Sequence, residues 1–239
     1  MSNDKYRILC TRPVTDSLIA VAGERGIHID VQEFIQIKPL LLPGLQEKIH
    51  DAVSKTMVFT SANAVQILSK NYLFNTVVPD AQIACIAGNT KQSVLETFPD
   101  CTILAEADYG NDLADAIIQR ESTHEVSFFC GNQRRNELPG KLKAAGIIVN
   151  EYVIYENTPI TVVITDDYDG ILFFSPSAAK SFFSANSIHK NTVCFAIGTT
   201  TAVALKDYTS NKIIVSTGTS PESMVQTAIF YFNNINCYE

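Results

Sequence analysis

Several short segments of the sequence place hydroxyl side chains, glycine or arginine directly after a run of apolar residues. Where a buried strand ends and a helix begins, such residues offer backbone N–H and hydroxyl donors to a carboxylate or a phosphate. Serine and threonine are also common helix caps, so capping alone is the alternative interpretation of each segment. Taken together, the segments predict an anion site that uses few lysines or arginines. They are Thr11-Arg12, Thr60-Ser61, Gly88-Asn89-Thr90, Gly131-Asn132, Ser175-Pro176-Ser177 and Gly198-Thr199-Thr200-Thr201.

Few charged or aromatic side chains accompany these turns. Arg12 directly follows the first predicted strand and is well placed to hold an anion. Arg134 and Arg135 fit an anion site and a solvated helix start equally well. Tyr155 ends the β-rich run Ile147–Tyr155, and a tyrosine in a strand is most often a packing residue. Position alone therefore favours packing for Tyr155.

The common motifs of cofactor-dependent and nucleophilic catalysis are missing from the sequence. It contains no phosphate-binding P-loop, no dinucleotide-binding glycine motif and no G-x-S-x-G nucleophile elbow. The histidines, at positions 28, 50, 124 and 189, lack metal-ligand spacing. Asp166, Asp167 and Asp169 cluster near a strand start, the wrong end for a site, and are predicted to form a solvated loop. We therefore expect neither a metal nor a cofactor.

The composition is that of an acidic globular protein of 239 residues with a net charge of −7. This charge excludes a general binder of nucleic acid or of anionic membranes. No apolar run approaches the ~20 residues of a membrane-spanning helix, and the polar N-terminus does not resemble a secretory signal. The six cysteines include no C-x-x-C pair, which favours reduced thiols over a disulfide framework or a metal site. We expect a cytoplasmic monomer that binds a small molecule.

The elements that must position the polar turns are duplicated in the sequence. Ile171–Ala179 runs from apolar residues into Ser-Pro-Ser, which predicts a buried strand followed at once by a helix. Met57–Val65 is a weaker copy, in which apolar spacing predicts a helix over Asn63–Asn71. Each copy is followed by a second strand–turn–helix, Ile83–Thr90 and Cys194–Ala202. Strands that alternate with helices in this way predict parallel sheets in two related halves.

The strand–helix–strand pattern at the start of the chain is also repeated later in the sequence. Cys10 aligns with Cys130 and Gly26 with Gly146, within similar strand–helix–strand patterns. The first copy opens the chain whereas the second closes the middle block, so one domain must be discontinuous. We predict an α/β protein of two similar parallel-sheet, flavodoxin-like domains joined by a two-stranded β linker. Domain 1 is predicted to comprise residues 1–35 and 160–239, domain 2 residues 40–152, and the linker strands residues 36–39 and 153–159.

The polar turns, in this order, resemble the uroporphyrinogen-III synthase family. The resemblance covers nearly the whole chain, and its specificity lies in the set of motifs rather than in any one of them. It implies two α/β domains joined by a two-stranded β-ladder, with the site in the cleft. Aligned on Thr90, the family's glycine falls on Ala87, and Gly88 is displaced by one position. The matching segments are Thr11-Arg12-Pro13, Phe59–Val65, Ala87–Thr90, Gly131–Gly146, Val153-Ile154-Tyr155, Phe173–Ala178 and Ile197–Ala202.

The resemblance implies an enzyme of tetrapyrrole and heme biosynthesis, a hydro-lyase. The family converts the linear tetrapyrrole hydroxymethylbilane to uroporphyrinogen III, with inversion of ring D and loss of water, and needs no metal or cofactor. Carried over motif by motif, it implies that Tyr155 is catalytic. The substrate-binding residues that it implies are Arg12, Ser61, Thr90, Ser175, Ser177, Gly198, Thr200 and Thr201.

A function of a different class also fits the duplication and the hinge. It is a cytosolic two-domain protein that binds or senses a small anion without catalysis. A bare α/β interaction domain is disfavoured by the density of hydroxyl-rich turns. The isomer of uroporphyrinogen formed from fresh hydroxymethylbilane distinguishes an enzyme from a binding protein, because uncatalysed cyclisation proceeds without inversion.

Overall fold

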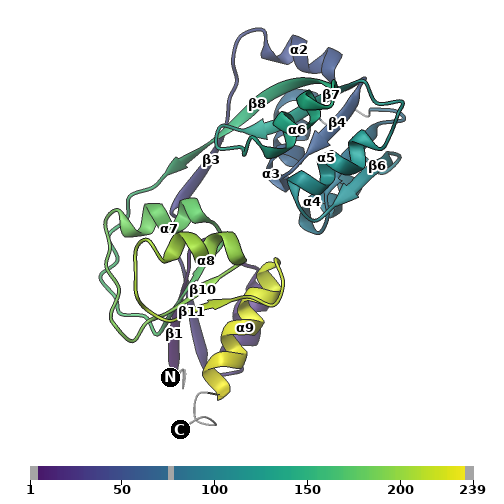
Figure 1. Cartoon of the computed structure of the whole chain (residues 1–239). Coiled ribbons are helices and arrows are strands. Elements are labelled where there is room, and N and C mark those ends of the chain that lie inside the picture. The colour runs from purple at the N-terminus through teal and green to yellow at the C-terminus, as the bar shows by residue number, and fades with distance from the viewer. Residues whose placement is uncertain (1–4, 75–77, 235–239) are drawn as a thin grey trace. The chain divides into compact units, whose positions relative to one another are not determined.

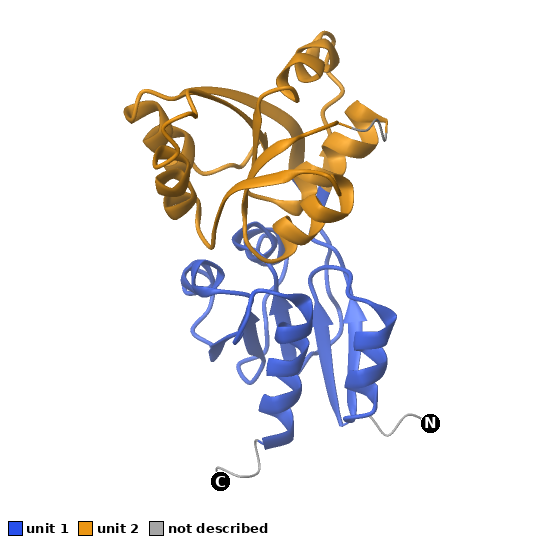
Figure 2. Ribbon diagram, turned by 90° about the vertical axis from the view of Figure 1, so that its right-hand side faces the viewer, with its two compact units in different colours: residues 1–36, 158–239 blue, residues 37–157 orange. Residues whose placement is uncertain are grey.

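The computed structural model describes residues 5–74 and 78–234. Contacts divide the chain into two compact units (Figure 2). Unit 1 contains residues 1–36 and 158–239, and unit 2 contains residues 37–157. Within the described residues, no helix is both long and apolar enough to cross a membrane.

Unit 1 alternates strands and helices drawn from both ends of the chain. Its elements are β1 (Tyr6–Cys10), α1 (Asp16–Gly23), β2 (Ile27–Val31), β9 (Gly170–Phe173), α7 (Pro176–Phe183), β10 (Val193–Ala196), α8 (Thr199–Leu205), β11 (Ile213–Val215) and α9 (Pro221–Asn234). The strands form one sheet in the order β11-β10-β9-β1-β2, and every neighbouring pair is parallel. This is the order of a flavodoxin-like doubly wound sheet.

Helices cover both faces of the unit 1 sheet (Figure 1). Ala22 of α1 and Met224 of α9 belong to the apolar cluster on one face. Phe182 of α7 and Leu205 of α8 belong to the cluster on the other face. Because the sheet is covered twice, its central strands β9 and β10 are buried at every residue, which explains their continuous apolar runs.

Unit 2 is also an alternating α/β unit. Its elements are β3 (Ile35–Pro39), which begins at the end of unit 1, α2 (Leu45–Ala52), β4 (Thr56–Phe59), α3 (Ala62–Ile67), the π-helix η1 (Leu68–Leu73), β5 (Gln82–Ile86), α4 (Asn89–Thr97), β6 (Thr102–Ala107), α5 (Gly110–Ile118), β7 (Glu125–Gly131), α6 (Glu137–Ala144) and β8 (Ile148–Pro159). The sheet order is β3-β8-β7-β4-β5-β6. Helices α2, α3, η1 and α4 contribute to the apolar cluster on one face, and α5 and α6 to the other (Figure 1).

The long strand β8 differs from its prediction. The β-rich run that ends at Tyr155 and the linker segment 153–159 are one continuous strand of 12 residues. Its neighbour in the sheet is β3. The Leu40 amide donates to the Ile154 carbonyl at 2.9 Å and the Ile160 amide to the Phe34 carbonyl at 2.9 Å, so the two segments run in opposite directions. The predicted two-stranded β linker is therefore present in the fold.

The helix predicted over Asn63–Asn71 also differs in the structure. The α-helix α3 ends at Ile67, and the chain continues as the wider turn of η1. Leu68, Tyr72 and Leu73 are all buried in this turn. The wider turn accommodates a residue that a regular α-helix would place on a different face, so burial of large side chains prevails over α-helical spacing.

Candidate active site

Each sheet has one point at which the strand order reverses. In unit 1 it lies between β1 and β9, and in unit 2 between β4 and β7. In doubly wound sheets the loops on either side of such a point diverge, and ligands bind beyond the carboxyl ends of the strands there. Four of the six polar turns follow these strands, and the turns at Gly88 and Gly198 follow the adjacent strands β5 and β10. Each unit therefore has its own candidate site region at the carboxyl edge of its sheet.

A cavity of about 340 Å³ lies at this edge of unit 2. The turns after β4, β6 and β7 contribute to it, together with β8. Hydroxyl, guanidinium, phenol and carboxylate groups therefore face the same space, which suits a polar ligand. Its lining includes Thr60, Asp108, Tyr109, Gly131, Arg134, Arg135 and Tyr155.

Tyr155 is the buried phenol of this cavity, with only 5% of its surface exposed. A β-carbon placed on Gly131 would lie 2.6 Å from the Tyr155 Cζ and 3.0 Å from its hydroxyl oxygen, so the ring occupies the space that a side chain at Gly131 would need. Burial raises the pKa of the Tyr155 phenol, and a hydrogen bond with Ser61 opposes this shift. The phenol consequently keeps its proton at neutral pH and can donate it.

Ser61 has two partners in the structure. As the residue before α3, it accepts a hydrogen bond from the Asn63 amide at 3.2 Å, which caps the helix. Its hydroxyl also interacts with the Tyr155 phenol. The sequence predicted either capping or ligand binding for this turn. In the structure, the Ser61 hydroxyl that caps α3 also contacts the Tyr155 phenol.

The two arginines after Gly131 are not equivalent. Arg134 forms an ion pair with Glu151, which also pairs with Lys143 at 2.6 Å. Arg135 is exposed at the start of the segment that leads into α6 and lines the cavity. Because Glu151 offsets the charge of Arg134, Arg135 is the better candidate to meet an anion at this edge.

The carboxyl edge of unit 1 is held together across its switch point. The Thr11 hydroxyl donates to the Leu172 carbonyl of β9 at 2.8 Å and accepts from the Phe174 amide at 3.4 Å. The Arg12 guanidinium lies over the Phe174 ring, with its carbon 5.4 Å from the ring centroid. The fold thus places Arg12 beside the turn that begins at Ser175.

Hydrogen bonds of two serines stabilise the turn after Phe174. Ser175 caps α7 by accepting from the Ala178 amide at 3.1 Å, with Pro176 at the first helical position. The Ser175 and Ser177 hydroxyls are hydrogen-bonded at 3.0 Å. Both residues are partly exposed, so a ligand can reach this turn while Ser175 caps the helix.

The glycine–threonine turns at the starts of α4 and α8 differ in detail. Gly88 precedes α4 with a φ of 71°, a conformation that favours glycine, whereas Gly198 precedes α8 with an extended backbone. Thr90 and Thr201 are buried, with 6% and 2% of their surfaces exposed, and Thr200 is exposed. Thr90 is the second residue of its helix and Thr201 the third, which matches the one-residue displacement of Gly88 in the sequence.

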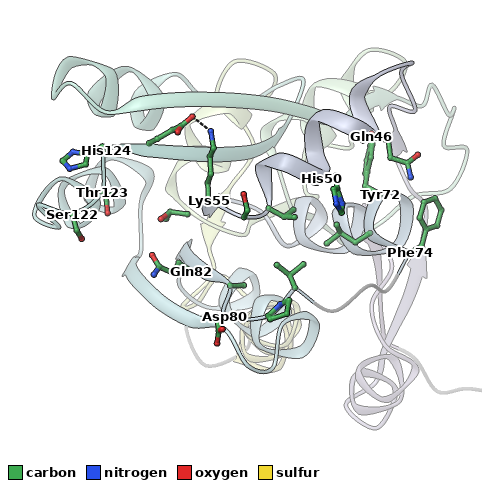
Figure 3. Close-up of a pocket in the computed structure, with 18 residues that line it drawn as sticks. Gln46, His50, Lys55, Tyr72, Phe74, Asp80, Gln82, Ser122, Thr123 and His124 are labelled. Carbon is green, nitrogen blue, oxygen red and sulfur yellow. Dashed lines mark hydrogen bonds and ion pairs between the residues drawn. The ribbon is translucent and has the colours of Figure 1, made fainter.

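A larger cavity, of about 830 Å³, lies at the opposite end of the unit 2 sheet (Figure 3). It is lined from α2, η1 and the amino ends of β4, β5 and β7, and includes the ion pair between Lys55 and Glu125. None of the polar turns predicted as ligand sites contributes to its lining. The smaller cavity with Tyr155 is therefore the candidate active site of unit 2.

Sequence reasoning missed part of this arrangement. It placed Gly131 in a polar turn but gave no sign of the close approach of the Tyr155 ring, which depends on the neighbouring strand. It left the role of Arg134 open, because its partner Glu151 lies on that same neighbouring strand. The side chains that the fold brings together are Tyr155 with Ser61 in unit 2, and Arg12 with the Ser175 turn in unit 1.

These observations define a class of protein. The chain is a doubly wound α/β protein of two units, with amide, hydroxyl and arginine donors at the strand-order reversal of each sheet. Such edges are suited to a small molecule that carries carboxylates or phosphates.

Comparison with known proteins identifies the family. The family model for uroporphyrinogen-III synthase HemD matches residues 16–226. The chain belongs to the uroporphyrinogen-III synthase family, and it has the lyase activity of that family, with a small tetrapyrrole as its substrate. A search of curated proteins gave no significant match.

Two solved structures share the fold. A uroporphyrinogen-III synthetase from Helicobacter pylori is 16% identical, with a TM-score of 0.67 over 94% of this chain and 99% of that chain. A mutant uroporphyrinogen III synthase from the extremely thermophilic bacterium Thermus thermophilus is 12% identical, with a TM-score of 0.61 over 96% of this chain and 99% of that chain. Both support the predicted architecture of two α/β domains.

Proposed function

We propose that Tyr155 is the general acid that starts the cyclisation of hydroxymethylbilane to uroporphyrinogen III. One observation carries this proposal: the Tyr155 phenol is buried at the switch point of unit 2, in a cavity, beside Ser61 and Gly131. Burial raises the pKa of a phenol that is already protonated at neutral pH, so the proton is present for transfer.

The substrate needs little activation by the enzyme. An electron-rich pyrrole expels the hydroxyl of its hydroxymethyl group readily and becomes an electrophilic azafulvene. A proton from the Tyr155 hydroxyl converts the departing hydroxyl to water. The substituted α-carbon of ring D then bonds to this electrophilic carbon on ring A, which gives a spirocyclic intermediate. The bond from that ring D carbon to the methylene bridge of ring C breaks, and the bridge carbon becomes the new electrophile. The other α-carbon of ring D bonds to the bridge carbon and loses its proton, which restores aromaticity with ring D inverted. A proton donor of this kind typically contributes roughly 10²–10⁴-fold to a rate.

Positioning is the larger task, because cyclisation without inversion is the uncatalysed outcome. Holding the reacting carbons in contact can contribute ~7–11 kcal/mol to lowering the barrier. The substrate carries many carboxylates, and we propose that turns of both units bind them through helix N-termini and hydroxyls. This explains how a protein with a net charge of −7 binds a polyanion. The residues proposed for this role are Arg12, Ser61, Thr90, Ser175, Ser177, Gly198, Thr200 and Thr201.

We further propose that the protein acts as a monomer in the cytoplasm, without nucleic-acid or membrane partners. Its acidic charge opposes binding to nucleic acid or anionic lipid. Cys10, Cys85, Cys101, Cys130 and Cys194 are free thiols, as is usual in a reducing compartment. No observation favours the alternative of a binding protein without catalysis.

An assay of the product isomers tests the proposal. The purified protein is mixed with fresh hydroxymethylbilane, and the uroporphyrinogens are oxidised and resolved. The expected product is isomer III, and a mixture that contains only isomer I contradicts an enzymatic role. Tyr155→Phe should lower kcat at least tenfold, within the range for loss of a general acid, and leave the circular dichroism spectrum unchanged. Wild-type turnover in this variant would remove Tyr155 from the mechanism.

A further inference from the structure

The strand that carries Tyr155 contains a β-bulge. The parallel strands β7 and β8 pair residue by residue from Glu125 opposite Ile148 to Cys130 opposite Val153. The next pair is Gly131 opposite Tyr155, so Ile154 has no partner on β7. A bulge of this kind bends the strand and turns the side chains that follow it, and bulges are frequent beside active sites.

The bulge changes the face on which Tyr155 lies. In a regular strand, successive side chains alternate between the two faces. Tyr152 packs against the cluster that includes Phe59 and Phe129, and Val153 packs against the cluster on the opposite face. Ile154 and Tyr155 then both belong to the first of these clusters. If Ile154 were a regular strand residue, Tyr155 would follow the alternation and share a face with Val153.

A second tyrosine holds this irregular segment. The Tyr72 hydroxyl forms a hydrogen bond with the Leu40 carbonyl and lies 3.3 Å from the Ile154 carbonyl. The Ile154 carbonyl also accepts from the Leu40 amide at 2.9 Å. Tyr72 is 5% exposed and comes from η1, whose π-helical turn buries Leu68, Tyr72 and Leu73 together. The hydroxyl therefore ties the bulged residue to the segment after β3.

We propose that Tyr72 is a positioning residue for the reaction: its hydroxyl fixes the bulge at Ile154, and the bulge directs Tyr155 onto the open space at Gly131. Tyr72 belongs to the opposite cavity rather than to the cavity of Tyr155 (Figure 3), so it acts through the strand and not by touching substrate. This inference rests on the proposed catalytic role of Tyr155.

Gly131 supplies the other half of the arrangement. Its φ does not lie in the left-handed region, so alanine fits the backbone there. A β-carbon at this position would nevertheless lie 2.6 Å from the Tyr155 Cζ, and the ring would have to move. Gly131→Ala therefore displaces Tyr155 without using Tyr72, and it provides an independent test of the same geometry.

The primary experiment compares Tyr72→Phe with the wild type by steady-state kinetics. We expect kcat to fall by roughly tenfold, because a misplacement of about 1 Å can cost up to 10²-fold, while KM changes little. Tyr208→Phe is the matched control, because Tyr208 is 41% exposed in unit 1. The control should keep wild-type kcat. Thermal unfolding of each variant verifies that the fold persists.

A double variant distinguishes positioning from a general loss of stability. If Tyr72 acts through Tyr155, the double variant Tyr72→Phe/Tyr155→Phe should have the same kcat as the single variant Tyr155→Phe. Effects that multiply would overturn the inference, as would a wild-type kcat in Tyr72→Phe. If Tyr155→Phe itself keeps full activity, the proposed function of Tyr155 fails instead.

Gly131→Ala keeps the test decisive if Tyr72→Phe does not fold. It should also lower kcat by roughly tenfold, and its effect should vanish in the Tyr155→Phe background. Gly23→Ala is its control, because a β-carbon at Gly23 has no neighbour within 4 Å. A Gly131→Ala enzyme with wild-type kcat would show that the Tyr155 ring does not need its observed position.

Discussion

The Thr11 hydroxyl donates to the Leu172 carbonyl at 2.8 Å, and this bond joins the first strand of the chain to a strand from its second half. The Thr11 amide donates to the same carbonyl at 3.1 Å, and the Thr11 side chain is 3% exposed. Two segments far apart in sequence are therefore locked at the switch point of unit 1. The neighbouring Arg12 guanidinium lies over the Phe174 ring.

Thr11→Val should test that lock. The substitution keeps the shape of the side chain but removes its hydroxyl, which should lower the free energy of unfolding by about 1 kcal/mol. Hydrogen exchange of the amides in β1 and β9 should accelerate in the variant. Thr161→Val, at an exposed position in the same unit, is the control and should leave exchange unchanged. Unchanged protection in Thr11→Val would show that the backbone ladder alone holds the two strands.

Ser175 allows capping and substrate binding to be separated. Ser175→Ala should destabilise α7 by ~1 kcal/mol, because the Ala178 amide loses its acceptor, whereas Ser175→Gly should cost only a few tenths. Both variants lack the hydroxyl. If the hydroxyl binds a substrate carboxylate, KM should rise in both variants by a similar factor. A rise confined to Ser175→Ala would identify Ser175 as a cap only.

Gly198 offers a test of the turn before α8. Its backbone is extended, and a β-carbon there would have no neighbour within 4 Å, so Gly198→Ala should fold with unchanged stability. If a substrate carboxylate meets the first amides of α8, the added methyl group should hinder it and raise KM by roughly tenfold, equivalent to about 1.4 kcal/mol. Urea unfolding and KM are measured in parallel. An unchanged KM would place the carboxylates elsewhere.

Gly88→Ala provides the contrast to Gly198→Ala. With a φ of 71°, Gly88 has a conformation that costs alanine ~1 kcal/mol or more. It should therefore lose stability whether or not substrate binds at that turn. The pair of variants separates a structural glycine from one that leaves room for a ligand.

Local features of the sequence predicted much of the fold. The apolar runs of β9 and β10 are continuous because a parallel sheet covered on both faces buries every residue. Ser61 and Ser175 start their helices as caps, and Gly146 follows α6 with a φ of 83°. The caps and the glycine depend on neighbours within a few residues, and the apolar runs can be read directly from the strand residues, so the sequence alone could reveal them. The ligand-binding roles of the turns stay predictions.

Features that depend on distant partners were not predictable. The bulge at Ile154 exists only relative to β7, and the change from α3 to η1 follows from the burial of Tyr72 and Leu73 in the core. The close contact of Tyr155 with Gly131 requires both strands in register. The family resemblance pointed to Tyr155, but nothing local showed what directs its side chain.

Buried thiols should make the protein sensitive to alkali. Burial raises the pKa of Cys10, Cys130 and Cys194 to about 12, and that of Cys85 to about 11, from 9.0. The folded state thus favours the neutral thiol. Its stabilising contribution is complete below the unfolded pKa near 9 and is lost as pH rises toward the folded values. By pH 10 the loss should be roughly 1 kcal/mol for each thiol.

Urea unfolding at pH 7.5 and pH 10, with a reducing agent present, measures this loss. Cys10→Ala should be less stable than the wild type at pH 7.5, because it removes buried atoms, yet its free energy of unfolding should fall less between the two pH values. Cys101→Ala is the comparison, since Cys101 is only partly buried and has less to lose. If the free energy of unfolding falls by the same amount between pH 7.5 and pH 10 in Cys10→Ala and in the wild type, the Cys10 thiol does not contribute to alkaline sensitivity. Other groups would then determine stability at high pH.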